Sequence, residues 1–405
     1  MRGRGSSHSV VGVSFQQLMK LTFRAPRPFT AGVHGPAAFG TSFSYPYPST
    51  ITGTLSSIAY NKGYCRGLPV STRGGFEVEY NDHRVCIEEL LNNLLSSSNR
   101  IVGGNGTRFT VRAGYLSRRV GGGTVFYPYI GSSVFPEVTV LVEAFRSRWT
   151  NNKNRMAADI AEAYNYLLTT LNKKGREDCL QEEARTVAYK SVFKGIALQR
   201  GRKTAVEGML YSLESVKYCP PASIDAVIIS DSLQGGGLTE ILRLGKRGIA
   251  RLEIKPLKSR TGYPPLDVIE DKFNPDKSDY LLILTTPALI DDPGCLVVNG
   301  VVEIDDHTPF STWLAWNLLQ KYYENNATVI YIPKSGGLFE HSFGTVFSGW
   351  NTPQQRPRMP RLLVPPGTVV YVKNVGWERI REMAIKGLGL ESDLGWGSFV
   401  PVPIG

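Results

Sequence analysis

The 405-residue chain is long enough for two domains or one large one, and 42% hydrophobic with 20% charged residues is an ordinary globular composition. Its formal net charge of +11 favours an anionic partner without naming one. The longest apolar run, Tyr280 to Ile290, is too short to cross a bilayer, and the first residues show no signal peptide. We therefore expect a cytoplasmic protein without a membrane segment.

The five cysteines are odd in number, scattered, and never at C-x-x-C spacing. This pattern indicates neither a zinc site nor a disulfide framework. We expect buried free thiols in a reducing compartment, with no metal and no cofactor.

Helices and strands alternate without a regular βαβ rhythm, which favours the α+β class. The first strand is expected within Val10 to Ala25, and helices after Tyr47, after Asp82, from Met156 and from Thr308. Further strands are expected at 225–230, 250–256, 280–286, 327–333 and 367–373. A change from helix-rich to strand-rich sequence predicts two domains, residues 1–190 and 191–405.

Two segments near the N-terminus are candidate anion sites. In "FRAPRPF", Arg24 and Arg27 follow the first strand, and the neighbouring prolines stiffen the loop that presents them. These arginines bind either RNA or the chain's own carboxylates. In "PYPSTITG", Ser49 or Thr50 is expected to cap a helix, and that helix start either binds phosphate or is simply capped.

The segment "GIALQRGRKTAVEGMLY" predicts a β-hairpin with a basic tip made of Arg200, Arg202 and Lys203. Lys194, on its first strand, is a further candidate for RNA contact. A basic tip either meets phosphates or is a solvated turn.

Glycines form the third kind of candidate. The closing sequence "IKGLGLESDLGWGSF" holds Lys386 with Gly387 and Gly389, then Gly395 and Gly397. Glycine permits positive φ and close approach of a backbone or a phosphate. The spacing lacks G-x-G-x-x-G and no helix follows, so a dinucleotide site is not indicated. RNA contact and a tight turn packing Trp396 both remain open. Gly236, in the "QGGGLTE" segment, is also a candidate for RNA contact.

Several of these segments together resemble the RAMP superfamily of CRISPR proteins, and within it the family of the third subunit of type III-B (Cmr) effectors. The segments that carry the resemblance are, in chain order, "FRAPRPFTAG", "PYPSTITGTLSSIAY", "GIALQRGRKTAVEGMLYSLESV", "QGGGLTEILRLGKRG" and "FSGWNTPQQRPRMPRLLVPPGTVVYV". The resemblance implies two ferredoxin-like (RRM-related) domains with long insertions. It also implies a non-catalytic subunit that binds the 5′ handle of CRISPR RNA, the large cyclase-type subunit and the first backbone RAMP subunit.

Two other functions remain open. Some RAMP proteins cut CRISPR RNA with a histidine, and His34, which is also a candidate for RNA contact, could serve here with Arg27 and Tyr45. A loop histidine is more often structural, so we expect no enzyme. The other alternative is a purely structural scaffold, which the salt dependence of RNA binding would distinguish from an RNA-binding subunit.

Overall fold

The computed structural model describes the chain in segments, and all structural statements below concern these residues. They are 17–24, 39–40, 43–65, 68–71, 77–80, 83–95, 109–172, 187–198, 205–219, 222–230, 237–244, 248–275, 279–291, 297–298, 301–302, 310–322, 326–334, 339–347, 350–351, 356–357 and 360–404. None of the helices in these segments is long and apolar enough to span a membrane.

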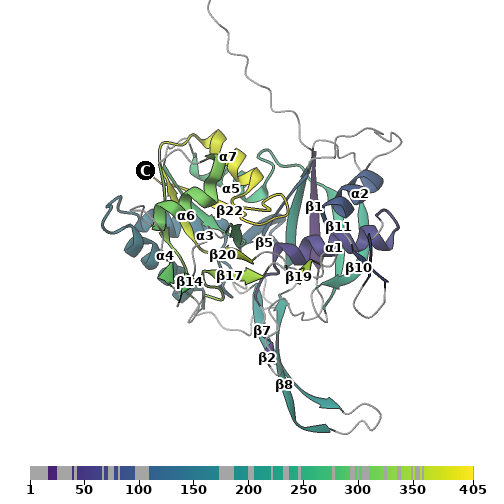
Figure 1. Ribbon diagram of the computed structural model, residues 1–405. Coiled ribbons are helices and arrows are strands. Elements are labelled where there is room, and N and C mark those ends of the chain that lie inside the picture. The colour runs from purple at the N-terminus through teal and green to yellow at the C-terminus, as the bar shows by residue number, and fades with distance from the viewer. Residues whose placement is uncertain are drawn as a thin grey trace, which may run out of the picture.

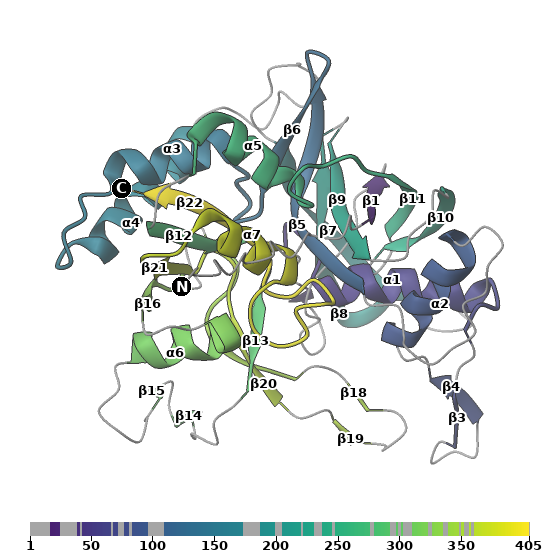
Figure 2. The same cartoon turned by 90° about the horizontal axis from the view of Figure 1, so that it is seen from above.

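The larger of the two main sheets has six strands, and every neighbouring pair is antiparallel (Figures 1 and 2). In order across the sheet they are β10 (Leu238–Leu244), β11 (Gly248–Pro256), β1 (Gln17–Arg24), β9 (Ser223–Ser230), β5 (Phe109–Val120) and β6 (Gly123–Pro128). The sheet therefore brings strands from both ends of the first 256 residues together.

One face of this sheet is buried by two helices, α1 (Pro48–Asn61) and α2 (His83–Leu95). Alternate residues of each strand point to the same face, and on β1 these are Met19, Leu21 and Phe23, all at most 1% exposed. They share one hydrophobic core with Ile51 and Leu55 of α1 and with residues of α2. The alternate apolar residues of β1 thus fix which face of the strand is buried.

A second sheet of four antiparallel strands lies in the other half of the molecule. Its order is β16 (Ala327–Tyr331), β21 (Val369–Val372), β12 (Asp279–Leu284) and β22 (Phe399–Ile404). Five helices surround it: α3 (Val138–Arg148), α4 (Met156–Asn172), α5 (Pro264–Phe273), α6 (Phe310–Leu319) and α7 (Trp377–Lys386). Helices α3, α5 and α7 contact β22, and α4 and α6 contact β16 (Figure 2). This sheet is the centre of a second hydrophobic core.

The remaining strands form small sheets and hairpins. Two of these sheets have three strands: β13 (Ala288–Ile290), β20 (Pro360–Val364) and β17 (Gly344–Phe347) form one, and β2 (Phe39–Gly40), β8 (Ala205–Tyr218) and β7 (Ala188–Leu198) form the other. The two-stranded pairs are β14 (Val297–Val298) with β15 (Val301–Val302), β18 (Trp350–Asn351) with β19 (Arg356–Pro357), and β3 (Leu68–Ser71) with β4 (Glu77–Tyr80). A short 3₁₀ helix, Gln320–Tyr322, follows α6.

The structure confirms the α+β class, with antiparallel sheets, and each strand expected in the second half. The ferredoxin-like duplication stays a prediction. The domain ranges 1–190 and 191–405 also remain a prediction, but the division between the two main sheets lies elsewhere. The six-stranded sheet takes β1, β5 and β6 from before residue 190 and β9, β10 and β11 from after it. The four-stranded sheet begins only at β12.

The expectation of free thiols is wrong for three of the five cysteines. Cys65 and Cys86 form a disulfide that joins the end of the α1 segment to α2, and Cys219 is also disulfide-bonded. The Cys65–Cys86 pair could not be recognised from the sequence, because the two cysteines are 21 residues apart and meet only when α1 and α2 pack together. The cysteines therefore no longer support the expectation of a reducing compartment.

Candidate nucleic-acid interface

Arg24 is the last residue of β1, and its side chain is exposed. On the neighbouring strand β11, Arg251 lies directly opposite it. Two cations at facing positions of an antiparallel pair repel each other, and Arg251 here also pairs with Glu253 at 3.3 Å. RNA contact by Arg24 stays a prediction. Arg27 and His34 lie outside the described residues.

The start of α1 differs from the prediction. The helix begins at Pro48, with Tyr47 as its N-cap and no side-chain hydrogen bond to the cap, so neither Ser49 nor Thr50 caps it. Proline is favoured at the first helical position because its missing N–H would have no partner there. Ser49 is exposed and Thr50 is half-buried inside the first turn, and phosphate binding by either remains a prediction.

The predicted hairpin is present as β7 and β8, which pair from Ala188 with Tyr218 to Leu198 with Ala205. Figure 1 shows the two strands projecting away from the rest of the molecule. Lys194 lies on β7, whereas the tip residues Arg200, Arg202 and Lys203 lie outside the described residues, as does Gly236. The hairpin is confirmed, and the role of its tip stays a prediction.

The four closing glycines all have positive φ, between +63° and +96°. Three of them face backbone or side-chain atoms of this chain so closely that no Cβ fits. An ideal Cβ would lie 2.1 Å from a guanidinium nitrogen of Arg112 at Gly387, 2.4 Å from the Leu289 carbonyl at Gly389, and 1.9 Å from the Leu388 carbonyl at Gly397. Packing within the chain therefore already requires glycine at these three positions. RNA contact by the four glycines stays a prediction.

Residues 388–398, here called the closing segment, lie between α7 and β22 and touch both halves of the molecule (Figure 2). Val111 of β5 donates its N–H to the Asp393 carbonyl at 2.8 Å, and Gly389 donates to the Leu318 carbonyl of α6 at 2.8 Å. Leu390 donates to the Leu289 carbonyl of β13 at 2.7 Å. The segment thus connects the six-stranded sheet to the second core.

Arg112 of β5 is fully buried against this segment. Its guanidinium donates to the carbonyls of Ser392 and Trp396 and to the Ser398 hydroxyl. A β-bulge between Arg112 and Tyr115 shifts the register of β5 against β9 and brings Tyr115 into the second core. Burial lowers the pKa of Arg112 to about 10, while nearby Tyr263 raises it, so the side chain remains charged at neutral pH. Sequence analysis missed Arg112, since nothing in "FTVRAGY" distinguishes it from an exposed strand arginine.

A second buried polar cluster, also missed, surrounds Glu340 and His341. Glu340 accepts hydrogen bonds from the Ser44 hydroxyl and the Tyr129 hydroxyl, both at 2.6 Å, and its carboxylate lies 2.9 Å from the Lys190 ammonium. The His341 ring bonds the Tyr129 hydroxyl at 2.8 Å. The cluster attaches the segment before α1, and the base of β7, to the second half of the chain.

The environment of His341 opposes catalysis at that residue. The ring is 5% exposed and stacks on Phe43 with ring centres 4.0 Å apart. Burial lowers the pKa of His341 to about 4, Glu340 raises it and Lys190 lowers it further. Tyr45, a residue of the nuclease alternative, is 2% exposed; its hydroxyl accepts from the Gly114 N–H at 3.0 Å, and burial raises its pKa. Both side chains are thus buried and bonded within the chain.

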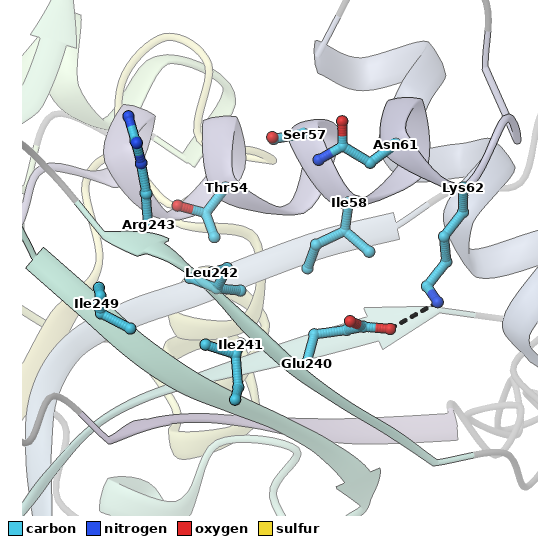
Figure 3. A pocket seen from close by; sticks show the side chains of 10 residues that line it. All are labelled: Thr54, Ser57, Ile58, Asn61, Lys62, Glu240, Ile241, Leu242, Arg243 and Ile249. Atoms are coloured by element: carbon cyan, nitrogen blue, oxygen red, sulfur yellow. Dashed lines mark ion pairs between the residues drawn. The ribbon is translucent and has the colours of Figure 1, made fainter.

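A pocket of about 620 Å³ lies between α1 and the edge strand β10 (Figure 3). Lys62 at the end of α1 reaches across it to Glu240 of β10, with 2.6 Å between ammonium and carboxylate. Ile241, Arg243 and Ile249 line its other side. Lys386, by contrast, forms an ion pair of 2.7 Å with Glu382 on its own helix. Nowhere in the described segments do three His, Cys, Asp or Glu side chains gather as a metal site would require.

Comparison with known families decides the identity of the chain. A family model described as "CRISPR-associated protein (Cas_Cmr3)" matches residues 143–402, more than half of the sequence. The chain belongs to the Cas_Cmr3 family. The matched region runs from α3 to β22, and therefore includes the β7–β8 hairpin and the closing segment.

Solved structures similar to this Cas_Cmr3 chain are remote in sequence. Two are cryo-EM structures of the type III-B Cmr-beta complex bound to cognate target RNA, one of them also with AMPPnP. They are 15% and 16% identical, cover 87% of this chain and 86% of theirs, and have TM-scores of 0.46 and 0.44. A third, from a study of a Cas6-related gene of Pyrococcus furiosus, is 11% identical, covers 73% of this chain and 98% of that one, and has a TM-score of 0.22. No curated protein matches the chain.

Proposed function

We propose that this Cas_Cmr3 protein is the non-catalytic RNA-binding subunit of a type III-B CRISPR effector in the cytoplasm. It binds the 5′ handle of CRISPR RNA, and it docks the large cyclase-type subunit and the first backbone RAMP subunit. The observation that carries the proposal is family membership over residues 143–402. Two ferredoxin-like domains with insertions are the fold that this proposal implies.

Charge and shape support RNA as the ligand. The chain carries a net charge of +11, and the exposed Arg24 faces Arg251 across two strands. The β7–β8 hairpin projects from the body (Figure 1), and its tip sequence is "QRGRKT". Cations that project from a rigid element bind the phosphates of single-stranded RNA without reading its sequence.

The proposal of a non-catalytic subunit rests on what cleavage would need. Metal-free cleavage needs a base, an acid and a cation near one phosphate. His341 and Tyr45 are buried and engaged within the chain. His34, the histidine that the sequence offered for the nuclease alternative, lies outside the described residues.

The test uses the assembled effector with end-labelled CRISPR RNA. We expect the complex to bind RNA with the natural 5′ handle at least about ten-fold more tightly than RNA whose handle nucleotides are permuted. The reason is that the loss of a single specific base contact typically lowers affinity by about ten-fold or more. Crosslinks from the handle should map to this subunit, and the RNA should remain intact with and without magnesium.

Three results would contradict the proposal. Equal affinity for both RNAs would remove handle recognition. Handle crosslinks that map only to other subunits would indicate that this protein is a purely structural scaffold. Cleavage that is abolished by His34→Ala would make the protein a CRISPR RNA-processing endoribonuclease.

A further inference from the structure

The six-stranded sheet is covered unequally on its two faces. Helices α1 and α2 bury one face along most of its width. On the opposite face, Val227 and Ile229 of β9 and Tyr115 of β5 belong to the second core, so the central strands are covered there too. Strands β1, β11 and β10 extend beyond this cover, and their outward side chains, apart from the buried Glu253, are exposed or half-buried.

Five cations occupy this part, which we call the basic sheet face: Lys20, Arg24, Arg243, Arg251 and Lys255. Their placement follows from strand alternation, because the residues between them, such as Leu21, Phe23, Leu252 and Ile254, are buried in the core on the other side. Arg251 and Lys255 are 58% and 67% exposed in their side chains. Arg243, on the edge strand, also lines the pocket beside α1.

The register places like charges opposite each other on this face. Arg24 pairs with Arg251, and Lys20 pairs with Lys255. Like charges directly opposite each other are unfavourable. Glu253 lies between the two pairs on β11 and offsets part of this repulsion, so it is the excess of cations over carboxylates on the face that indicates an anionic ligand.

Two carboxylates lie beneath the cations and neutralise part of their charge, so five cations against two carboxylates leave an excess of three positive charges on the face. Asp225 is fully buried and 2.5 Å from the Lys20 ammonium, and Glu253 is 7% exposed. The Glu253 carboxylate lies 2.8 Å from the Lys255 ammonium and 3.3 Å from the guanidinium of Arg251. These contacts hold the cationic side chains in place, and they leave more than half of Arg251 and Lys255 exposed but only 24% of Lys20.

Apolar surface lies next to the cations. Ile241 is 77% exposed and Ile249 49% exposed, on the edge strand β10 and on β11 beside it. Ile241 faces Arg251, and Ile249 faces Arg243. Phosphates need the cations, and sugars and bases can lie against the isoleucines. The described residues of this face include no aromatic side chain, so strong stacking and base selectivity are not expected.

We propose that the basic sheet face binds the phosphate backbone of single-stranded RNA independently of base sequence. This inference rests on the proposed function only in taking RNA as the anion that this CRISPR-associated chain meets. It assigns the contact to β1, β10 and β11, at positions of which only Arg24 was indicated by the sequence.

The test measures binding of the full chain to a fluorescent uridine oligonucleotide that contains no handle. The double variant Arg251→Gln/Lys255→Gln removes two charges and keeps an amide that can donate to Glu253. We expect about ten-fold or more loss of affinity near 100 mM salt, and a fall of about 1.4 in the slope of log K against log salt, since each phosphate contact contributes about 0.7.

Two controls accompany the variant. Lys153→Gln/Lys272→Gln makes the same change in charge at exposed positions on the α3–α4 connection and on α5, and it should leave affinity and slope nearly unchanged. Arg251→Lys keeps the charge and should keep most of the affinity. Thermal unfolding of each variant confirms that the chain is folded.

Unchanged affinity and slope in Arg251→Gln/Lys255→Gln would overturn the inference, as would equal losses in both double variants. Intact RNA binding with lost assembly into the effector would make the face a protein interface. Failure of the proposed function would give a different result. The natural and permuted handles would then bind equally well, both in the parent and in the sheet-face variants. A parent chain that binds no uridine oligonucleotide, alone or assembled, would also overturn the inference.

Discussion

Arg112 and Arg251 are strand residues of the same six-stranded sheet, and their surroundings are opposite. Arg112 is 0% exposed and donates to carbonyls of the closing segment. Arg251 is 58% exposed and lies opposite Arg24. A buried guanidinium with backbone acceptors holds two parts of a fold together, because removing it leaves those acceptors unsatisfied. Arg251 pairs with Glu253 at 3.3 Å, but most of its side chain is exposed, so this ion pair contributes little to folding.

The comparison extends to the segments around them. The closing segment uses glycines to bring its backbone against β5, α6 and β13, so its polar groups are satisfied within the chain. The basic sheet face keeps its side chains outward over two buried carboxylates. The closing segment should therefore control stability, and the sheet face should control binding. The predictions below test this division in order of expected effect.

The largest effect is expected at Gly397. Gly397→Ala places a Cβ 1.9 Å from the Leu388 carbonyl in a backbone with φ of +63°. We expect a loss of at least about 4 kcal/mol in the free energy of unfolding, which is in the exceptional range for a single change. Denaturant unfolding measures it.

Gly121→Ala is the matched control, because Gly121 has φ of +55° and open space around its missing Cβ. This substitution should lower the free energy of unfolding only by the cost of placing a Cβ in the left-handed backbone region, about 1–2 kcal/mol. Equal costs at the two positions would mean that the closing segment is not tightly packed.

The next effect is expected at Arg112. Arg112→Met keeps most of the volume but leaves the Ser392 and Trp396 carbonyls without this donor. We expect a loss of about 3 kcal/mol, since an unsatisfied buried acceptor costs about 1–3 kcal/mol. Arg251→Met on the neighbouring face should change stability by no more than about 1 kcal/mol.

Both variants are unfolded in urea under the same conditions. Similar free energies of unfolding for Arg112→Met and Arg251→Met would abolish the distinction between the two arginines. A larger loss for Arg251→Met would reverse it.

A smaller effect is expected from acidification, through His341. The folded protein holds the pKa of His341 at about 4, below its ordinary value of 6.5, because burial disfavours the charged ring. The unfolded chain therefore takes up the proton first, and stability is lost as the pH falls from about 6.5 towards 4. Between pH 7 and pH 5 the loss from this residue should be about 2 kcal/mol.

The measurement compares the parent with His341→Gln, which can still bond the tyrosine hydroxyls but does not titrate. The variant should lose about 2 kcal/mol less than the parent between pH 7 and pH 5. Parallel pH profiles for the two proteins would show that the ring is protonated as readily in the folded state as in the unfolded chain.

Local patterns in the sequence were enough for several elements. The alternate apolar residues of β1, the long apolar face of α4 and the turn between β7 and β8 each appear within a few neighbouring residues. The start of α1 was misplaced because Pro48 and the serine and threonine after it are all compatible with a helix start. Arg24 and the glycines were singled out as candidates for RNA contact, which stays a prediction, and the sequence left open what they contact within the chain.

Tertiary structure decided what each polar residue faces. Arg112 and Arg251 look alike in the sequence, and only the β-bulge, the order β10-β11-β1-β9-β5 and the cover over the central strands separate them. Cys65 forms a disulfide with Cys86, and Glu340 accepts a hydrogen bond from Ser44, 296 residues away, because the packing of helices and sheets brings these residues together. Secondary structure depends largely on side-chain and backbone preferences that act over a few residues, so the sequence by itself indicated several elements, although helices α3, α5 and α7 were not among those expected. Burial, pairing and charge environment depend on contacts between distant segments, which no local pattern encodes.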